Sequence, residues 1–173
     1  VIANTEPLYD DYMNEVGIRY NLGIDNFADK VKGTPTPDII KKYFSHLAPT
    51  KLREFEQEIE RFEQEMDIPP IDGALKFIDH VKKAGYKIGL VTSSQQIKMK
   101  RALAILGLTG KFDTEVTADR ITIGKPNPMC FLLAARDLNA QPDECIVFED
   151  SIHGINAGCE AGMRVIGVTT SFG

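Results

Sequence analysis

Residues 74–168 alternate between helical and strand-like segments, and this alternation constrains the fold more than any other feature of the sequence. Strands separated by helices form parallel sheets whose two faces are covered by those helices. The expected helices are 74–84, 95–106, 128–138 and 152–161, and the expected strands are 87–91, 115–117, 145–148 and 164–168. We therefore expect an α/β fold with a doubly wound, Rossmann-like parallel sheet.

The first seventy residues are built differently, because only helical spacing is found before the Pro-rich segment 67–73. Helices are expected over 8–20, 37–47 and 50–66, and in the last of these the apolar residues recur at steps of three and four. A chain of 173 residues can hold a domain with an insert. We expect a small helical domain over residues 6–70, and an α/β core domain formed by residues 1–5 and 71–173.

Composition disfavours several classes of function. A formal net charge of −5 argues against binding of a nucleic-acid backbone. We find neither an apolar run long enough for a membrane span nor the pattern of a signal peptide. Cys130, Cys145 and Cys159 are not closely paired, and the histidines are scattered, which disfavours disulfide frameworks and zinc sites. We expect a cytoplasmic protein, monomeric and without nucleic-acid or membrane partners, whose metal ligands would be carboxylates.

Polar side chains follow the expected strands where each strand ends. Residues 92–94 (Thr-Ser-Ser) follow one apolar strand, and Glu149 and Asp150 follow another. Lys125 lies in the loop before the helix that begins at Pro128. Because ligands of open parallel sheets bind beyond the carboxyl ends of the strands, we expect these residues to converge on one pocket.

Such a set suits phosphoryl transfer, in which donors and cations offset the charge that spreads over the phosphoryl oxygens. The hydroxyl of Thr92 can donate to a phosphate oxygen, and Ser93, Ser94 and the start of the next helix add donors. Lys125 supplies positive charge, while Glu149 and Asp150 offer oxygen ligands to Mg²⁺. Each element alone is explained as well by a turn, a surface lysine or a helix cap. Their combination favours phosphoryl transfer.

These segments together resemble the haloacid dehalogenase superfamily in its β-phosphoglucomutase-like branch, and the resemblance covers essentially the whole chain. Residues 90–94 (LVTSS) resemble the second motif of the family and 124–126 (GKP) the third. Residues 147–151 (VFEDS), followed by 154–158 (GINAG), resemble the fourth. Residues 1–7 (VIANTEP) resemble the segment after the first motif, which in the family holds a nucleophilic and an acid/base aspartate.

On this resemblance we expect the 173 residues to be a fragment that lacks the nucleophile, the first core strand and the last elements, and to be inactive as it stands. The complete enzyme would form an aspartyl-phosphate intermediate. The resemblance implies that Thr92 and Lys125 act in catalysis, and that Asp150 binds Mg²⁺ with Glu149 as a second ligand or an outer-shell partner. It also implies a mobile helical cap, inserted after the first strand, that selects the substrate. The residues expected to bind the substrate or its phosphate are Ser93, Ser94, Asn127, Thr5, Lys32, Gly33 and Thr34.

Two departures separate the chain from the phosphoglucomutase subgroup, whose cap loop carries an arginine and whose hinge carries a histidine. Here loop 31–38 has no arginine, and Tyr9 stands at the hinge position. A mutase must grip the second phosphate of its intermediate, which suits an arginine. We therefore expect a phosphatase for a small phosphomonoester such as a sugar phosphate. A phosphomutase and a non-catalytic binding module remain alternatives, while a dinucleotide-binding protein is disfavoured because no G-x-G-x-x-G is found.

Overall fold

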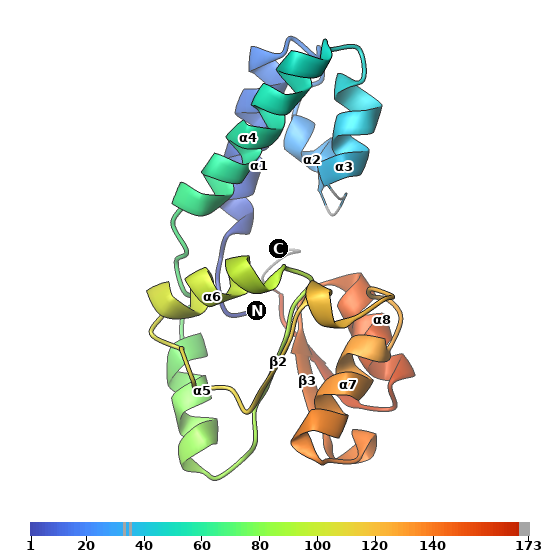
Figure 1. The fold of residues 1–173 in the computed structure, drawn as a ribbon. Coiled ribbons are helices and arrows are strands. Elements are labelled where there is room, and N and C mark those ends of the chain that lie inside the picture. Colours follow the sequence, from blue (N-terminus) through green and yellow to red (C-terminus); the bar gives the residue numbers. More distant parts are fainter. Residues whose placement is uncertain (33, 35, 170–173) are drawn as a thin grey trace. The chain divides into compact units, whose positions relative to one another are not determined.

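The computed structural model of the protein describes residues 1–32, 34 and 36–169. These residues form two compact units. The core unit consists of residues 1–4 and 68–169, and the helical unit consists of Thr5–Asp67. Strands alternate with helices in the core unit, whereas the other unit contains helices (Figure 1).

The helical unit contains the helices α1 (Glu6–Arg19), α2 (Phe27–Val31), α3 (Thr36–Ile39) and α4 (Pro49–Glu65), and α3 runs into a π-helical turn, η1 (Ile40–Phe44). Helices were predicted close to α1, α4 and the α3–η1 segment. Helix α2 was not predicted, because a helix of five residues is too short to show a 3.6-residue period.

Aromatic side chains fill the centre of the helical unit. Phe27, Phe44 and Phe55 are completely buried, and each contributes about 2–3 kcal/mol of hydrophobic stabilisation. The ring of Tyr20 lies edge-on to two of them, with centroids 5.3 Å from Phe44 and 5.0 Å from Phe55. Gly17 lets α1 approach α2, since a Cβ atom at this position would lie 2.7 Å from the Cβ of Phe27. The rings of Tyr12 on α1 and Phe62 on α4 stack with centroids 4.0 Å apart, so these two helices lie side by side (Figure 1).

The core unit contains four strands, which are β1 (Gly89–Val91), β2 (Thr114–Val116), β3 (Ile146–Glu149) and β4 (Arg164–Gly167). Its helices are α5 (Ala74–Lys83), α6 (Gln96–Ile105), α7 (Met129–Leu138) and α8 (Ile152–Glu160). Two short 3₁₀ turns, η2 (Ala118–Arg120) and η3 (Pro142–Glu144), precede α7 and β3. The order of helices and strands predicted from the sequence is confirmed, and the bounds differ by a few residues.

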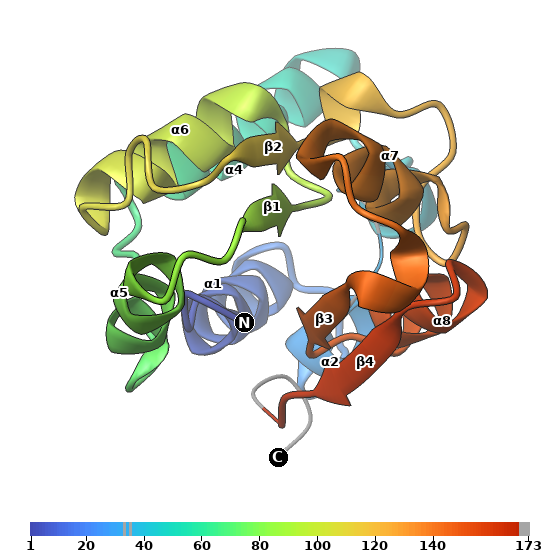
Figure 2. The same cartoon turned by 90° about the horizontal axis from the view of Figure 1, so that it is seen from below.

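The strands pair in parallel, as predicted. β1 pairs with β2, with Leu90 opposite Glu115, and β3 pairs with β4, with Val147 opposite Val165. Within the part of the chain that the structure describes, these are two separate two-stranded sheets (Figure 2). An α/β fold with parallel strands is therefore confirmed, while a single doubly wound sheet remains a prediction.

Helices cover both faces of the β1–β2 pair. Successive strand residues point to opposite faces, so the neighbours of Leu90 and Val91 show what covers each face. Leu90 packs against a cluster that contains Ile78 of α5 and Leu103 of α6. Val91 packs against the cluster formed by α7 and α8. The second cluster also contains Val116 of β2 and Val147 of β3, so α7 joins the two strand pairs through one shared core.

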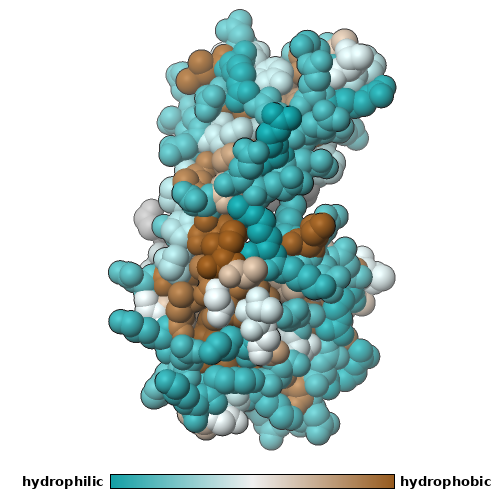
Figure 3. Space-filling view, turned by 60° about the vertical axis from the view of Figure 1, so that its left-hand side comes forward, coloured by the Kyte–Doolittle hydropathy of each residue, from teal (hydrophilic) through white to brown (hydrophobic). Residues whose placement is uncertain are grey.

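One face of the β3–β4 pair is less well covered. Ile146, Phe148 and Ile166 are partly exposed, and the ring of Phe148 lies edge-on to Phe77 of α5 with centroids 5.1 Å apart. Figure 3 shows apolar side chains gathered at the surface in one view of the molecule. None of the described helices is both long enough and apolar enough to cross a membrane.

The chain leaves and re-enters the core unit along two neighbouring segments. The amide of Asn4 donates to the carbonyl of Pro69 over 2.8 Å, and the amide of Ile71 donates to the carbonyl of Ile2 over 2.8 Å. An antiparallel bridge between Ala3 and Pro70 lies between these bonds. The two ends of the helical unit are therefore attached to adjacent stretches of the core.

Candidate functional site

The loop after β1 is folded by hydrogen bonds that position Thr92. Its amide donates to the carbonyl of Val116 at the end of β2 over 2.9 Å. Its hydroxyl oxygen accepts from the amide of Ser94 over 3.1 Å, so the hydroxyl hydrogen remains available for another acceptor. Thr92 is half-buried, while Ser93 and Ser94 are exposed. The hydroxyls of this loop are thus placed at the carboxyl end of β1.

Lys125 and Glu149 form a buried ion pair. The Nζ atom of Lys125 lies 2.7 Å from Oε2 of Glu149, and the two side chains are only 12% and 9% exposed. The Lys125 ammonium also lies 5.2 Å from the ring centroid of Phe131, within the range of a cation–π contact. The structure therefore brings together two of the predicted site residues that are 24 positions apart in the sequence.

The other carboxylate oxygen of Glu149, Oε1, also accepts hydrogen bonds. Oε1 accepts from the amides of Asp150 and Ser151 over 3.1 and 3.0 Å and from the hydroxyl of Ser151 over 2.9 Å. A carboxylate that accepts hydrogen bonds at both oxygens, one of them from a lysine, is held in a single orientation. Of the two predicted roles of Glu149, this arrangement favours the outer-shell partner over the direct metal ligand.

Ser151 and Gly154 explain why Glu149 fits beneath the start of α8. The hydroxyl oxygen of Ser151 accepts from the amide of Gly154 over 3.0 Å and so caps the helix. Gly154 is required by space, because a Cβ atom there would lie 2.1 Å from Cδ of Glu149. A helix cap was the alternative explanation of residues 149–151 in the sequence, and Ser151 forms that cap, whereas no task was predicted for Gly154.

Asp150 follows directly and lies beside the first residue of the chain. Its Oδ2 atom is 2.9 Å from the amino nitrogen of Val1, and its side chain is 18% exposed. Mg²⁺ is bound in proteins through one or two carboxylates together with water and substrate phosphate oxygens. Asp150 fits such a site as a single carboxylate. Within the described residues, no group of three or more acidic, histidine or cysteine side chains could hold a metal ion.

Asn127 and Thr5 have local structural tasks. The side-chain oxygen of Asn127 accepts from the amide of Met129 over 3.0 Å, at the beginning of α7. Thr5 precedes α1 in the helical unit, where its carbonyl accepts from the amide of Tyr9 over 3.2 Å. Their predicted contacts with substrate remain predictions.

The predicted substrate contacts of loop 31–38 lie in the helical unit. The ammonium of Lys32 is 3.2 Å from Oδ2 of Asp10 and 3.7 Å from Oε2 of Glu6, both on α1. The hydrogen bond with Asp10 raises the pKa of Lys32 above its ordinary value. The amide of Thr34 donates to the carbonyl of Val31 over 2.9 Å, while Gly33 lies outside the described residues. The side chain of Lys32 is therefore attached to α1.

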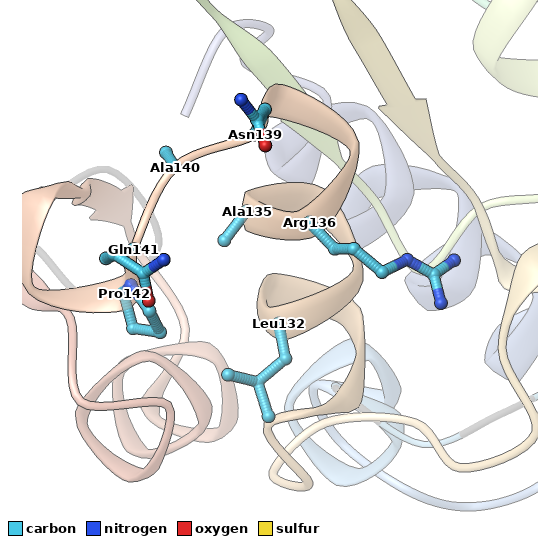
Figure 4. Close-up of a pocket in the computed structure, with 7 residues that line it drawn as sticks. All are labelled: Leu132, Ala135, Arg136, Asn139, Ala140, Gln141 and Pro142. Atoms are coloured by element: carbon cyan, nitrogen blue, oxygen red, sulfur yellow. The ribbon is translucent and has the colours of Figure 1, made fainter.

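A shallow hollow of about 290 Å³ lies elsewhere in the core unit, between the C-terminal half of α7 and the segment that leads to η3 (Figure 4). Its lining residues are Leu132, Ala135, Arg136, Asn139, Ala140, Gln141 and Pro142. None of the predicted site residues is among them. The hollow is therefore separate from the strand-end site.

Comparison with known proteins gives matches over nearly the whole chain. The family model for haloacid dehalogenase-like hydrolases matches residues 1–168. YhcW of Bacillus subtilis (strain 168) is 37% identical over 73% of this chain and 56% of its own length, so the chain spans little more than half of that relative. The phosphorylated carbohydrates phosphatase of Thermotoga maritima is 30% identical over 99% of this chain and 82% of its own length. The crystal structure of β-phosphoglucomutase from Clostridium difficile has a TM-score of 0.72 and 26% identity, covering 96% of this chain and 79% of that one.

Proposed function

We propose that this chain, which belongs to the haloacid dehalogenase-like hydrolase family, is part of a magnesium-dependent phosphatase that hydrolyses a small phosphorylated metabolite, with sugar phosphates as the substrate class. The observation that carries the proposal is the buried Lys125–Glu149 pair next to Asp150 at the carboxyl end of β3. A cation held rigidly beside a carboxylate suits the binding of a phosphate and a metal ion together. The phosphorylated carbohydrates phosphatase of Thermotoga maritima supports the substrate class.

Each residue has a distinct task in the proposed reaction. Thr92 donates its hydroxyl hydrogen to a phosphoryl oxygen, and Ser93 and Ser94 add donors from the same loop. Lys125 offsets the charge of the phosphoryl group, and Glu149 holds the ammonium in place. Asp150 would hold Mg²⁺, which neutralises phosphate charge when bound.

We assign the covalent step to an aspartate of the family's first motif. In the family, this motif precedes the segment that residues 1–7 resemble. In the proposed step one carboxylate oxygen of this aspartate attacks phosphorus, and the substrate oxygen leaves with a proton from the second aspartate of that motif. Water then hydrolyses the aspartyl-phosphate and releases inorganic phosphate. Such covalent catalysis replaces one difficult displacement by two easier ones.

We further propose that the helical unit acts as the cap, and that the two strand pairs belong to one doubly wound sheet in the complete protein. In this assignment Lys32, Gly33 and Thr34 contact the part of the substrate that is not transferred. Closure of such a cap excludes water from the reaction. The ion pairs of Lys32 with Asp10 and Glu6 support the proposal for Lys32, because they limit the positions of its ammonium group.

A phosphomutase is the second candidate, and the similarity to β-phosphoglucomutase from Clostridium difficile favours it. The absence of an arginine from loop 31–38 speaks against it, because a mutase must also bind the second phosphate of its intermediate. The two activities differ in their products. A phosphatase releases inorganic phosphate, whereas a mutase returns an isomeric sugar phosphate.

The test is phosphate release by the full-length natural protein from a panel of sugar phosphates and other phosphomonoesters, with Mg²⁺ and with a chelator. Release that disappears with the chelator is the expected result. Conversion of a sugar phosphate without phosphate release would support the mutase instead. In the same assay Asp150→Asn should lose the magnesium-dependent release. Its matched control is Asp143→Asn, since Asp143 is an exposed carboxylate in η3, and this control should leave the rate unchanged.

A further inference from the structure

Helix α6, which follows the phosphate-binding loop, is capped by a residue from a different segment. Its own N-cap residue, Gln95, makes no side-chain capping bond. The amide of Gln96 instead donates to Oδ2 of Asp119 over 2.6 Å. A carboxylate is a favourable acceptor at this place, because the first amides of a helix have no intrahelical partner and the helix dipole is positive there.

Asp119 lies in the turn η2, and that turn is fixed to the strands and to α7. The amide of Ala118 donates to the carbonyl of Ser94 over 3.0 Å. On the other side of Asp119, the guanidinium of Arg120 donates to the carbonyl of Glu115 over 2.8 Å and pairs with Asp137 of α7 over 2.8 Å. These bonds on both sides of Asp119 hold its carboxylate next to the start of α6.

These bonds join the two loops that carry the proposed phosphate-binding groups. Loop 92–95 lies between β1 and α6, and the segment that contains η2 leads on to Lys125. The amide of Thr92 donates a hydrogen bond to the carbonyl of Val116 at the end of β2, and the amide of Ala118 donates one to the carbonyl of Ser94. These two backbone hydrogen bonds connect loop 92–95 to the segment that contains η2. The hydrogen bond from the amide of Gln96 to the carboxylate of Asp119 adds a side-chain connection between them.

We propose that Asp119 is a positioning residue for the phosphate site, which holds the loop of Thr92 in the conformation that accepts a phosphoryl group. This inference rests on the proposed function. Without the carboxylate, loop 92–95 would spend less time in the binding conformation, and the apparent affinity for phosphate would fall by the same fraction. Asp119 itself does not touch the phosphate.

The same contact changes how the phosphate is held. Sequence reasoning expected the start of α6 to supply donors to the anion, but the amide of Gln96 is already bonded to a carboxylate. Phosphate binding then depends on the hydroxyls of the loop and on Lys125 rather than on the dipole of α6. Asp119 was not found from the sequence, although an acidic residue shortly after a strand is the same signal that drew attention to Asp150.

Asp113 provides a matched control for a merely structural role. Its Oδ2 atom accepts from the amide of Ile88 over 2.8 Å, and its Oδ1 atom accepts from Lys82 over 2.6 Å. Like Asp119, it is an exposed aspartate that binds a backbone amide across the β1–β2 pair. It does so at the opposite end of the strands, away from Thr92.

The experiment compares Asp119→Ala, Asp119→Asn and Asp113→Ala in the full-length natural protein. The readouts are the inhibition constant of inorganic phosphate and amide hydrogen exchange of the peptide that spans residues 90–99. In Asp119→Ala we expect the inhibition constant to rise about fivefold, the factor that corresponds to one helix cap, and exchange to become faster. Asp119→Asn keeps an acceptor oxygen and should restore both, while Asp113→Ala should change neither.

An unchanged inhibition constant in Asp119→Ala, or an equal rise in Asp113→Ala, would overturn the inference. Absence of turnover in the wild-type protein would overturn the proposed function instead. In that case hydrogen exchange still decides the positioning role. Faster exchange in Asp119→Ala alone would support it, and unchanged exchange would refute it.

Discussion

Replacing Gly154 by alanine should destabilise the core unit, although alanine is the better helix former. Gly154 lies in the first turn of α8 and is buried. An alanine Cβ atom would lie 2.1 Å from Cδ and 2.3 Å from Oε2 of Glu149, distances at which one of the groups must move. The Glu149 side chain is also the partner of Lys125, so its displacement separates the buried ion pair.

The magnitude follows from two opposing effects. Helix propensity favours alanine over glycine by about 1 kcal/mol. Separation of a buried ion pair costs about 3–5 kcal/mol, because both charges lose their partner away from water. We therefore expect Gly154→Ala to lower the free energy of unfolding by about 2–4 kcal/mol, and to slow phosphate release because Lys125 is no longer held in place.

The measurement is urea unfolding followed by circular dichroism, with the midpoint compared at an unchanged slope. At a slope of about 1–3 kcal/mol per molar urea, the midpoint should fall by roughly 1 M or more. Asn156→Ala is the matched control, because Asn156 is exposed in the same helix and alanine has the higher propensity there too. This control should be neutral or slightly stabilising.

A second background tests whether Glu149 is the cause. In Glu149→Ala the side chain that obstructs the new Cβ atom is absent, so Gly154→Ala should then be neutral or stabilise by up to about 1 kcal/mol. If Gly154→Ala lowered the unfolding free energy equally in both backgrounds, the steric explanation would be refuted.

Four further predictions concern single residues. Lys125→Ala should lower the unfolding free energy by about 3–5 kcal/mol, because a buried carboxylate loses its partner, and should reduce phosphate release; an unchanged urea midpoint would contradict this. Asp150→Asn should abolish magnesium-dependent turnover, and an unchanged rate with Mg²⁺ would show that Asp150 is not a ligand of the proposed metal ion. Lys32→Ala should change the relative KM values of a sugar phosphate panel while kcat is largely retained, with a stability change below about 1 kcal/mol for this partly exposed pair. The hydrogen bond from Thr114 lowers the pKa of Asp137 below its ordinary 3.8. The ionised carboxylate of Asp137 therefore stabilises the fold above pH 3.8, and this stabilisation is lost as the pH falls through the lowered pKa. The difference in unfolding free energy between wild type and Thr114→Val should therefore shrink from about pH 6 toward about pH 2, and a constant difference would show that the bond acts independently of ionisation.

Several features of the site could be predicted because they depend on order along the chain. Apolar runs separated by helical segments predicted the four strands, and the carboxyl ends of parallel strands meet at one edge. Thr92 after β1 and Glu149 at the end of β3 therefore had to lie at strand ends. The pairing of Lys125 with Glu149 could not be predicted in this way, because it depends on the path of loop 121–128, which no local pattern in the sequence encodes.

The sequence by itself determined the succession of helices and strands, since periodicity and turn residues are local properties. The tertiary structure decided which polar groups meet. Lys125 pairs with Glu149, and Asp119 caps α6 from another segment, as a result of strand pairing and of the paths of the loops between the strands and helices. These contacts leave no periodic signal in the sequence, because each joins residues whose separation is set by the path of the chain and not by the repeat of a helix or strand.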